Sequence, residues 1–346
     1  MKRVNSNDIA RLAGVSRSTV SRVINGYANV PPQTREKVMK VIKENHYYPL
    51  LSGQLLTGKP IKTLGLFMIS SAAIAVDPLT SRFLMHVIDA AAERGYLVLC
   101  CILDNLADKK NVNHVRKIFM EGRIDAGVFI NINNHEPAVD ELVELGKVVG
   151  LFDYYHEGED LPNRITVNFD RNTGEKTIDY LHDLGHRRIA ILDGDLSRIS
   201  CIHRHESHLH GLMKHNLPMK NKWMGMGGII SESGYEGARR LLLGCMDDLP
   251  TAICPHNDAA AFGVYRACGE LGLRIPEDLS VVGADGHENG RYTNPPLTTF
   301  AFDFREMFAS LVSRVIDAVT QREDVPRSVF FESEFLERGS CRRIGG

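Results

Sequence analysis

Short apolar runs alternate with helix-like stretches from residue 63 onward, and this alternation limits the possible fold more than any other feature. TLGLFMI at 63–69, LVLCCI at 97–102 and RRIAILDG at 187–194 have the length and composition of buried strands. SRFLMHVIDAAAERGY at 81–96 has helical spacing of its apolar residues. Strands that alternate with helices form parallel sheets with helices on both faces. We therefore predict an α/β body, which binds ligands at the carboxyl ends of its strands.

Length and cysteine usage narrow the class of protein. The 346 residues are enough for two or three domains. The seven cysteines are odd in number and include no CxxC pair, which argues against a disulfide framework and a zinc ribbon. The first residues lack the apolar core of a signal peptide, and the apolar stretch at 64–76 is too short to span a bilayer. We expect a cytoplasmic protein with reduced thiols.

The charge is divided unevenly along the chain. Residues 1–62 carry eleven Lys or Arg and three Asp or Glu, whereas the whole chain has 41 basic and 43 acidic residues. A small basic head on an acidic body favours a polyanion as the partner of the head alone. The alternative is a basic solvated face with no partner.

The head has the pattern of a helix-turn-helix unit. Asn5 is placed to cap a first helix that Gly14 ends. Ser16 or Ser18 then caps a short second helix with Val20 and Val23 inward. A third helix follows through residues 31–47. In such a unit the second helix enters the major groove of DNA N-terminus first.

The polar residues of the head supply the candidate DNA contacts. Arginine suits the paired acceptors of guanine, serine is permissive, and small polar side chains bond phosphates. We assign base contacts to Arg17, Ser18 and Arg22, and further DNA contacts to Asn5, Ser16, Thr19, Ser21 and Asn25. The alternative for Arg17 and Arg22 is that they only solvate an amphipathic helix.

Residues 7–49, NDIARLAGVSRSTVSRVINGYANVPPQTREKVMKVIKENHYYP, resemble the DNA-binding head of the LacI/GalR (lactose-repressor-like) family. The resemblance implies a hinge helix in the minor groove next, with Leu56 as the leucine that wedges between base pairs. Gly53 and Gln54 stand where the family has Ala and Arg. We expect a hinge that folds only on the operator, and weaker DNA binding.

The resemblance continues through DYLHDLGHRRIAILDG at 179–194, residues 251–286 and NPPLTTFAFDFREM at 294–307. It implies a two-lobed, periplasmic-binding-protein-like core with an effector between the lobes. Strand ends, a crossover and the resemblance together select the candidate effector residues, which are Ser70, Ser71, Asp153, Tyr154, Arg204, His208, Asn257, Asp285, Phe302 and Phe304. In the family, the positions of Asp153, Asn257 and Asp285 commonly bond a sugar-like ligand. We interpret Asp258 as a helix N-cap.

Five histidines crowd the stretch SCIHRHESHLHGLMKH at 200–215. The resemblance places His208 where the family has an arginine that points into the effector pocket, and Arg204 one turn earlier. Histidine is smaller and titrates near neutrality, so a smaller ligand or a pH-sensitive effector response is an alternative to a sugar. HESH is one residue short of the HExxH zinc motif, and we expect no metal and no cofactor. We interpret His203, His205, His210 and His215 as solvent-exposed.

The predicted architecture is a small all-α helix-turn-helix head (1–47), a hinge (48–62) and a two-lobed α/β core with parallel sheets. Its N-terminal lobe takes residues 63–164 and 302–331, and its C-terminal lobe takes 165–301 and 332–346. The C-terminal residues FLERGSCRRIGG lack leucine heptads, which favours a homodimer without a coiled-coil tail.

We predict a sequence-specific transcriptional repressor in the bacterial cytoplasm, associated with the nucleoid. Its partners are a pseudo-palindromic operator duplex, a small sugar-like effector and a second copy of the chain, with no membrane. Two alternatives stay open. One is a metal-dependent hydrolase built on His203–His210, and the other is a solute-binding module without regulation. Neither explains the basic head.

Overall fold

The computed structural model describes residues 4–47, 60–69, 78–154, 161–320 and 326–345. Contacts divide the chain into two compact units, Met1–Ile61 and Lys62–Gly346. No helix among the described residues is long and apolar enough to cross a membrane. All seven cysteines fall in the described part and are unpaired.

The first unit is a three-helix head with a small core of its own. Its helices are α1 (Ser6–Ala13), α2 (Arg17–Ile24) and α3 (Pro32–Glu44). Asn5 caps α1 in a capping box with Asp8, and Gly14 ends the helix at φ 60°. Its core consists of buried apolar residues from all three helices and the α2–α3 connection, namely Ile9, Ala10, Ala13, Val20, Val23, Val30 and Val38.

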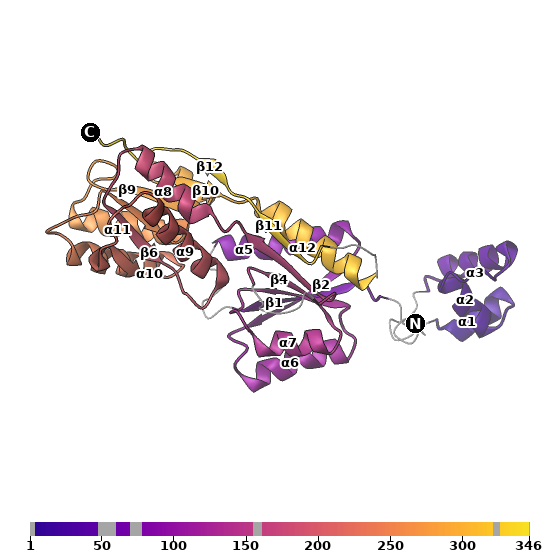
Figure 1. Ribbon diagram of the computed structural model, residues 1–346. Coiled ribbons are helices and arrows are strands. Elements are labelled where there is room, and N and C mark those ends of the chain that lie inside the picture. Colours follow the sequence, from indigo (N-terminus) through magenta and orange to yellow (C-terminus); the bar gives the residue numbers. More distant parts are fainter. Residues whose placement is uncertain (1–3, 48–59, 70–77, 155–160, 321–325, 346) are drawn as a thin grey trace. The chain divides into compact units, whose positions relative to one another are not determined.

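The second unit contains two six-stranded sheets, each with helices on both faces (Figure 1). We call the part around the first sheet the N-lobe. Its strand order is β11-β5-β4-β3-β1-β2, and every pairing in it is parallel. The strands are β1 (Thr63–Ile69), β2 (Leu97–Leu103), β3 (Ala126–Ile130), β4 (Val148–Phe152), β5 (Arg164–Phe169) and β11 (Ser328–Phe331).

Two apolar cores cover the faces of this sheet. On one face lie α5 (Pro78–Glu93) and α12 (Phe304–Val319), which Figure 1 shows on the opposite side from α6 (Lys109–Met120) and α7 (Pro137–Glu144). β2 is an edge strand, and its burial pattern is mostly exposed. The predicted doubly covered parallel sheet is therefore present, and β2 and β11 form its two edges.

We call the part around the second sheet the C-lobe, with strand order β12-β10-β9-β8-β6-β7. The strands are β6 (Ile189–Asp193), β7 (Met224–Met226), β8 (Ala252–Pro255), β9 (Ser280–Asp285), β10 (Thr298–Ala301) and β12 (Glu334–Leu336). The helices are α8 (Thr173–Asp183), α9 (Ile199–Lys214), α10 (Ser231–Gly244) and α11 (Asp258–Leu271), with short turns η2 (Asn221–Trp223) and η3 (Glu288–Arg291). β12 pairs antiparallel with β10, and the other pairings are parallel.

The chain first leaves the N-lobe after Phe169, later than the boundary at residue 164 that the sequence suggested. Residues 164–169 form β5, which pairs with β4 on one side and β11 on the other. The buried Ile165 and Val167 hold this segment in the N-lobe sheet. The chain returns between β10 and α12, and it crosses again between β11 and β12.

Candidate functional site

The second helix of the head presents a polar, cationic face. Arg17, Ser18, Ser21 and Arg22 are exposed on α2, while Val20 and its apolar neighbours face the head core. Among the described residues, neither the Arg17 nor the Arg22 guanidinium forms a hydrogen bond or an ion pair. Two permanent cations with unused donors therefore stand on one short helix.

Other predicted DNA contacts also hold the head together. The Ser16 hydroxyl accepts a hydrogen bond from the Thr19 amide at 3.1 Å, which makes Ser16 the cap of α2. The same hydroxyl lies 2.7 Å from that of Ser18. The side-chain oxygen of Asn5 accepts hydrogen bonds from backbone amides in the first turn of α1. Asn25 is the C-cap of α2 and donates to the Ser21 hydroxyl at 3.3 Å.

Three of the predicted contact residues lie outside the described residues. These are Leu56 in the predicted hinge and Ser70 and Ser71 after β1. Gly53 and Gln54, which carry the hinge prediction, are outside as well.

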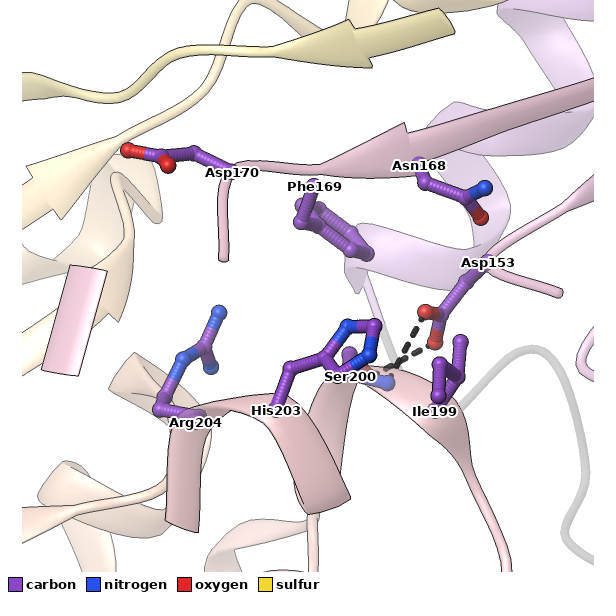
Figure 2. Close-up of a pocket in the computed structure, with 8 residues that line it drawn as sticks. All are labelled: Asp153, Asn168, Phe169, Asp170, Ile199, Ser200, His203 and Arg204. Atoms are coloured by element: carbon purple, nitrogen blue, oxygen red, sulfur yellow. Dashed lines mark hydrogen bonds between the residues drawn. The ribbon is translucent and has the colours of Figure 1, made fainter. Parts of the chain in front are cut away.

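A pocket lies between the two lobes and has about 260 Å³ of empty space, part of it continuous with solvent (Figure 2). The residues that line it come from the strand ends of the N-lobe and from the first turns of α9, namely Asp153, Asn168, Phe169, Asp170, Ile199, Ser200, His203 and Arg204. Only Asp153 and Arg204 were predicted. Phe169 ends β5 and Asp170 follows it, so the same strand-end rule that selected Asp153 could have found them.

Asp153 follows β4 in the N-lobe, and its side chain contacts the C-lobe. Its carboxylate accepts hydrogen bonds from the Ser200 amide at 3.1 Å and from the Ser200 hydroxyl at 2.6 Å (Figure 2). Burial raises the pKa of the Asp153 carboxyl, while the Ser200 hydrogen bond and the charges of Arg198 and Arg204 lower it. Asp153 has φ 57°, so the backbone turns sharply as it leaves the strand.

Arg204 forms the buried polar centre beneath the pocket. Its side chain is 6% exposed, and one guanidinium nitrogen lies 3.8 Å from a carboxylate oxygen of Asp285. Another donates to the main-chain carbonyl of His256. Burial lowers the pKa of His256 well below its usual value, and the nearby Arg204 lowers it further. The pocket thus has one fixed guanidinium whose charge is already balanced by Asp285.

The aromatic predictions for the pocket require correction. Tyr154 is buried in the N-lobe core and its hydroxyl accepts a hydrogen bond from the Glu136 amide at 3.3 Å. The turn at Asp153 sends the two neighbouring side chains in different directions. Phe302 and Phe304 belong to the core cluster beside α12, and Phe302 packs edge-on against Phe169 at 4.8 Å. Phe169 is therefore the aromatic residue that faces the pocket.

The start of α11 also differs from the prediction. Asn257 is the N-cap, because its side-chain oxygen accepts a hydrogen bond from the Ala260 amide at 2.9 Å. Its side-chain nitrogen donates to the Ile229 carbonyl at 3.0 Å. Its hydrogen bonds hold the fold, and it is not among the pocket-lining residues. Asp258, interpreted as the cap, is instead fully buried. Burial raises its pKa to about 8, and it accepts hydrogen bonds from Thr299 and His287.

The histidines of α9 have separate partners. His205 bonds Asp193 at 2.8 Å, His210 bonds Glu175 at 2.7 Å and His215 bonds Asp179 at 2.6 Å. Four of these histidines were expected to be exposed, but only His210 is. His205 contacts Asp193 of β6, His215 contacts α8, and His203 lines the pocket. In the described part of the chain, no three metal-ligating side chains gather to hold an ion.

His208 is buried against α8 rather than on the pocket wall. It is 2% exposed, and the close approach of Gly174 to its main-chain nitrogen leaves no space there. Its Nδ1 atom is buried and has no hydrogen-bond partner among the described residues. Burial lowers the pKa of His208 to about 3, and the adjacent Arg204 adds to the shift. The ring is therefore neutral at physiological pH, and it is Arg204 that reaches the pocket.

Comparison with known proteins agrees with this geometry. Residues 7–49 match the family described as bacterial regulatory proteins, lacI family, and residues 178–341 match the periplasmic binding protein-like domain. The chain belongs to the LacI family. It is therefore a DNA-binding transcriptional regulator and not an enzyme, and the hydrolase and solute-binding alternatives are not favoured.

Relatives match this LacI-family chain over nearly its whole length. The HTH-type transcriptional repressor PurR of Yersinia pestis (strain Pestoides F) is 29% identical over 335 residues, which cover 96% of this chain and 95% of that protein. The PurR of Yersinia pseudotuberculosis serotype O:1b (strain IP 31758) matches to the same extent.

Solved structures show the same fold. A Lac repressor dimer bound to operator and the anti-inducer ONPF has a TM-score of 0.79 and 26% identity, and the match covers 99% of this chain and all of that one. The complex of the transcriptional regulator CelR with cellobiose has a TM-score of 0.74 at 24% identity, over 98% of this chain. This chain therefore shares its fold, a helix-turn-helix head and a two-lobed core, with both structures.

Proposed function

We propose that the protein is a homodimeric repressor whose paired α2 helices bind the half-sites of a pseudo-palindromic operator. The observation that carries the proposal is the exposed face of α2, where Arg17 and Arg22 have no partner among the described residues. A free guanidinium on a helix of this kind suits the two acceptors on the major-groove edge of guanine. Ser18 and Ser21 on the same face are small enough to let the helix approach.

The ligand that switches operator affinity binds between the lobes, at the pocket of Figure 2. Asp153 offers acceptors to hydroxyl groups, and Phe169 offers an aromatic face to an apolar ring surface. Arg204 is already paired with Asp285, so the described residues that line the pocket include no unpaired arginine or lysine for a phosphate. These features favour a small neutral metabolite, sugar-like or related, over a phosphorylated one. The CelR structure, whose ligand is cellobiose, is in keeping with this class.

The second copy of the chain binds along β2. This edge strand exposes Leu97 to 73% and Ile102 to 60%, with Leu99 between them. An uncovered apolar edge strand invites pairing with another chain. A second copy that packs against β2 buries these apolar side chains, and the resulting dimer carries two heads for one operator. The Lac repressor relative is a dimer on its operator, which supports this arrangement.

The effector acts by binding one arrangement of the lobes better than another, because a ligand shifts a conformational equilibrium only by its difference in affinity. We place the protein in the bacterial cytoplasm, where its operator and its metabolite effector are both present.

Selection of binding sequences from fragmented genomic DNA of the source organism tests the DNA-binding part. The wild-type protein is expected to recover a recurrent palindrome, and the Arg17→Ala/Arg22→Ala variant is expected to lose it. The matched control is Arg11→Ala/Lys40→Ala, which removes the same charge from exposed positions on α1 and α3. A control that also loses the palindrome would show that net charge alone binds DNA.

Two further outcomes decide the proposal. Recovery of the same palindrome by Arg17→Ala/Arg22→Ala would exclude α2 as the element that contacts the bases. If the wild type selects nothing alone, the selection is repeated with a metabolite pool. A palindrome that then emerges identifies a corepressor requirement, and continued absence of any preference rejects sequence-specific binding.

A further inference from the structure

A second pocket lies inside the N-lobe, between α6 and α7, on the face of the sheet opposite α5 and α12 (Figure 1). We call it the α6–α7 pocket. It has about 240 Å³ of empty space, part of it continuous with solvent. None of the described residues that line it also lines the pocket between the lobes. The two pockets are therefore separate sites.

The walls of the α6–α7 pocket are apolar. Phe129 comes from β3 of the sheet, where it is fully buried and stacks on Phe67 with ring centroids 4.7 Å apart. The side chain of Ala138 on α7 is short, so it leaves space beside the larger residues. An empty space with such walls is filled favourably by an apolar group, because it offers a water molecule too few partners. The apolar lining consists of Leu106, Val112, Val115, Phe129, Ala138 and Leu142.

An ion pair bridges the two helices at this pocket. Arg116 on α6 donates from Nη2 to both carboxylate oxygens of Glu141 on α7. The two side chains are 42% and 40% exposed, so they lie at the surface while most of the apolar lining is buried. The Nε and Nη1 atoms of Arg116 have no partner among the described residues. An ion pair this exposed contributes little to stability, so a second carboxylate can share Arg116 or replace Glu141 at low cost.

We propose that the α6–α7 pocket binds a small amphipathic monocarboxylate, with the carboxylate on Arg116 and the aliphatic or aromatic part between the apolar walls. The planar guanidinium matches a carboxylate in geometry and charge. A sugar or a free phosphate is disfavoured, because its other polar groups would be buried without partners. The empty space is smaller than the roughly 300–1,000 Å³ of ordinary ligand sites, which limits the ligand to a short chain or a single ring.

The proposal gives the N-lobe a ligand of its own. Its chemistry differs from that of the neutral metabolite proposed for the pocket between the lobes, because an arginine with unused donors is present here and absent from the described lining there. The two sites can therefore be tested separately.

NMR titration of the full-length protein with hexanoate, without DNA, tests the proposal. With Ile, Leu and Val methyl groups labelled, the signals of Val112, Val115 and Leu142 are expected to shift in a saturable way. Ile199 lines the pocket between the lobes, and its signal is expected to stay in place. Affinity is expected to rise about fourfold for each CH₂ group added between acetate and hexanoate, as burial of that group implies. Hexanol, which has no charge, is expected to bind about tenfold more weakly than hexanoate.

The two partners of the ion pair are expected to have opposite effects on hexanoate binding. Arg116→Gln removes the cation and is expected to weaken binding about tenfold. Glu141→Gln removes the competing carboxylate and is expected to strengthen binding about threefold. If the ion pair only held the two helices together, both variants would weaken binding. The matched control is Arg123→Gln, which breaks an exposed ion pair with Glu121 just after α6 and is expected to change nothing.

A bulkier side chain tests the apolar part of the site. Ala138→Leu is expected to fill the pocket from α7 and to abolish the shift of Val115 with both hexanoate and hexanol. Methyl signals of the C-lobe are expected to stay unchanged, which shows that the variant is folded. If Ala138→Leu proves unstable, Val112→Phe fills the same space from α6, where Val112 is half-buried.

The absence of a saturable shift at Val112, Val115 and Leu142 would overturn the proposal, and so would a response at Ile199 alone. Equal affinity for hexanoate and hexanol, or weaker binding in both Arg116→Gln and Glu141→Gln, would reject a carboxylate as the ligand. The titration uses no operator and reports on the N-lobe. Its failure therefore leaves the DNA-binding proposal standing, and failure of the operator selection leaves the titration result intact.

Discussion

The head and the core both depend on arginine, but they use it in opposite ways. Arg22 on α2 is exposed and has no partner among the described residues. Arg204 on α9 is 6% exposed, lies 3.8 Å from Asp285 and donates to the His256 carbonyl. An unpaired surface arginine adds little to folding and stays available to a partner from outside. A buried, paired arginine supports the fold and fixes the geometry of its neighbours.

The largest effect is expected from Arg204→Ala. Removal of one partner of a buried ion pair leaves the other charge uncompensated, at a cost of about 3–5 kcal/mol. The free energy of unfolding of the core, measured by urea titration, is expected to fall by this amount, whereas Arg22→Ala is expected to change it little. A loss below about 1 kcal/mol in Arg204→Ala would remove the contrast between the two arginines.

Arg22→Ala is expected to affect binding and not folding. Loss of a bidentate contact to guanine costs about 1–3 kcal/mol of base discrimination. A surface substitution of this kind changes the free energy of unfolding by about 0.5 kcal/mol or less. Fluorescence anisotropy with the selected palindrome and with a scrambled duplex measures the first quantity. Equal weakening on both duplexes would indicate a phosphate contact instead of a base contact.

His208 makes the stability of the core depend on pH. Burial lowers its pKa to about 3 in the folded protein, against about 6.5 in the unfolded chain. The free energy of unfolding is unaffected by this group above about pH 6.5. It falls as pH falls from about 6.5 towards 3, because His208 binds a proton in the unfolded chain but not in the folded protein. Between pH 7.5 and 5.5, His208→Gln is expected to lose about 1.4 kcal/mol less than the wild type in urea titrations.

The exposed His210 supplies the control for this measurement. His210→Gln is expected to leave the loss of stability between the two pH values close to that of the wild type, since its side chain is 65% exposed. A His208→Gln protein with the full wild-type pH dependence would place the responsible proton on another group.

Ser16→Ala is expected to give the smallest effect. Loss of the cap on α2 costs about 1 kcal/mol of head stability. Circular dichroism during thermal unfolding detects it, and Ser16→Asp, another capping residue, is expected to restore stability. If Ser16→Ala leaves the head as stable as before but weakens operator binding, the hydroxyl serves DNA and not the helix.

The sequence predicted local structure in the head and the core because that structure depends on neighbouring residues. The capping of α1 by Asn5, the glycine that ends it and the strand–helix alternation are all set within a few positions. The LacI-family match confirms the function that the head motif predicted.

Side-chain direction inside the cleft was harder to predict, because it depends on segments far apart in the chain. Tyr154 and Asp153 are adjacent, yet one points into the core and the other across to Ser200, 47 positions away. Asn257 and Asp258 are both suitable helix-capping residues. Asn257 caps α11, whereas Asp258 accepts a hydrogen bond from the buried Thr299, 41 positions away. No local pattern in the sequence contains these partners.

The crossing between β11 and β12 has a consequence for truncated chains. The two strands lie within the last nineteen residues, yet β11 forms the outer edge of the N-lobe sheet and β12 that of the C-lobe sheet. A chain that stops after α12 lacks an edge strand in both sheets at once. A frameshift near the C-terminus, or a carboxyl-terminal protease, therefore alters both lobes at once, although it acts on a single short segment.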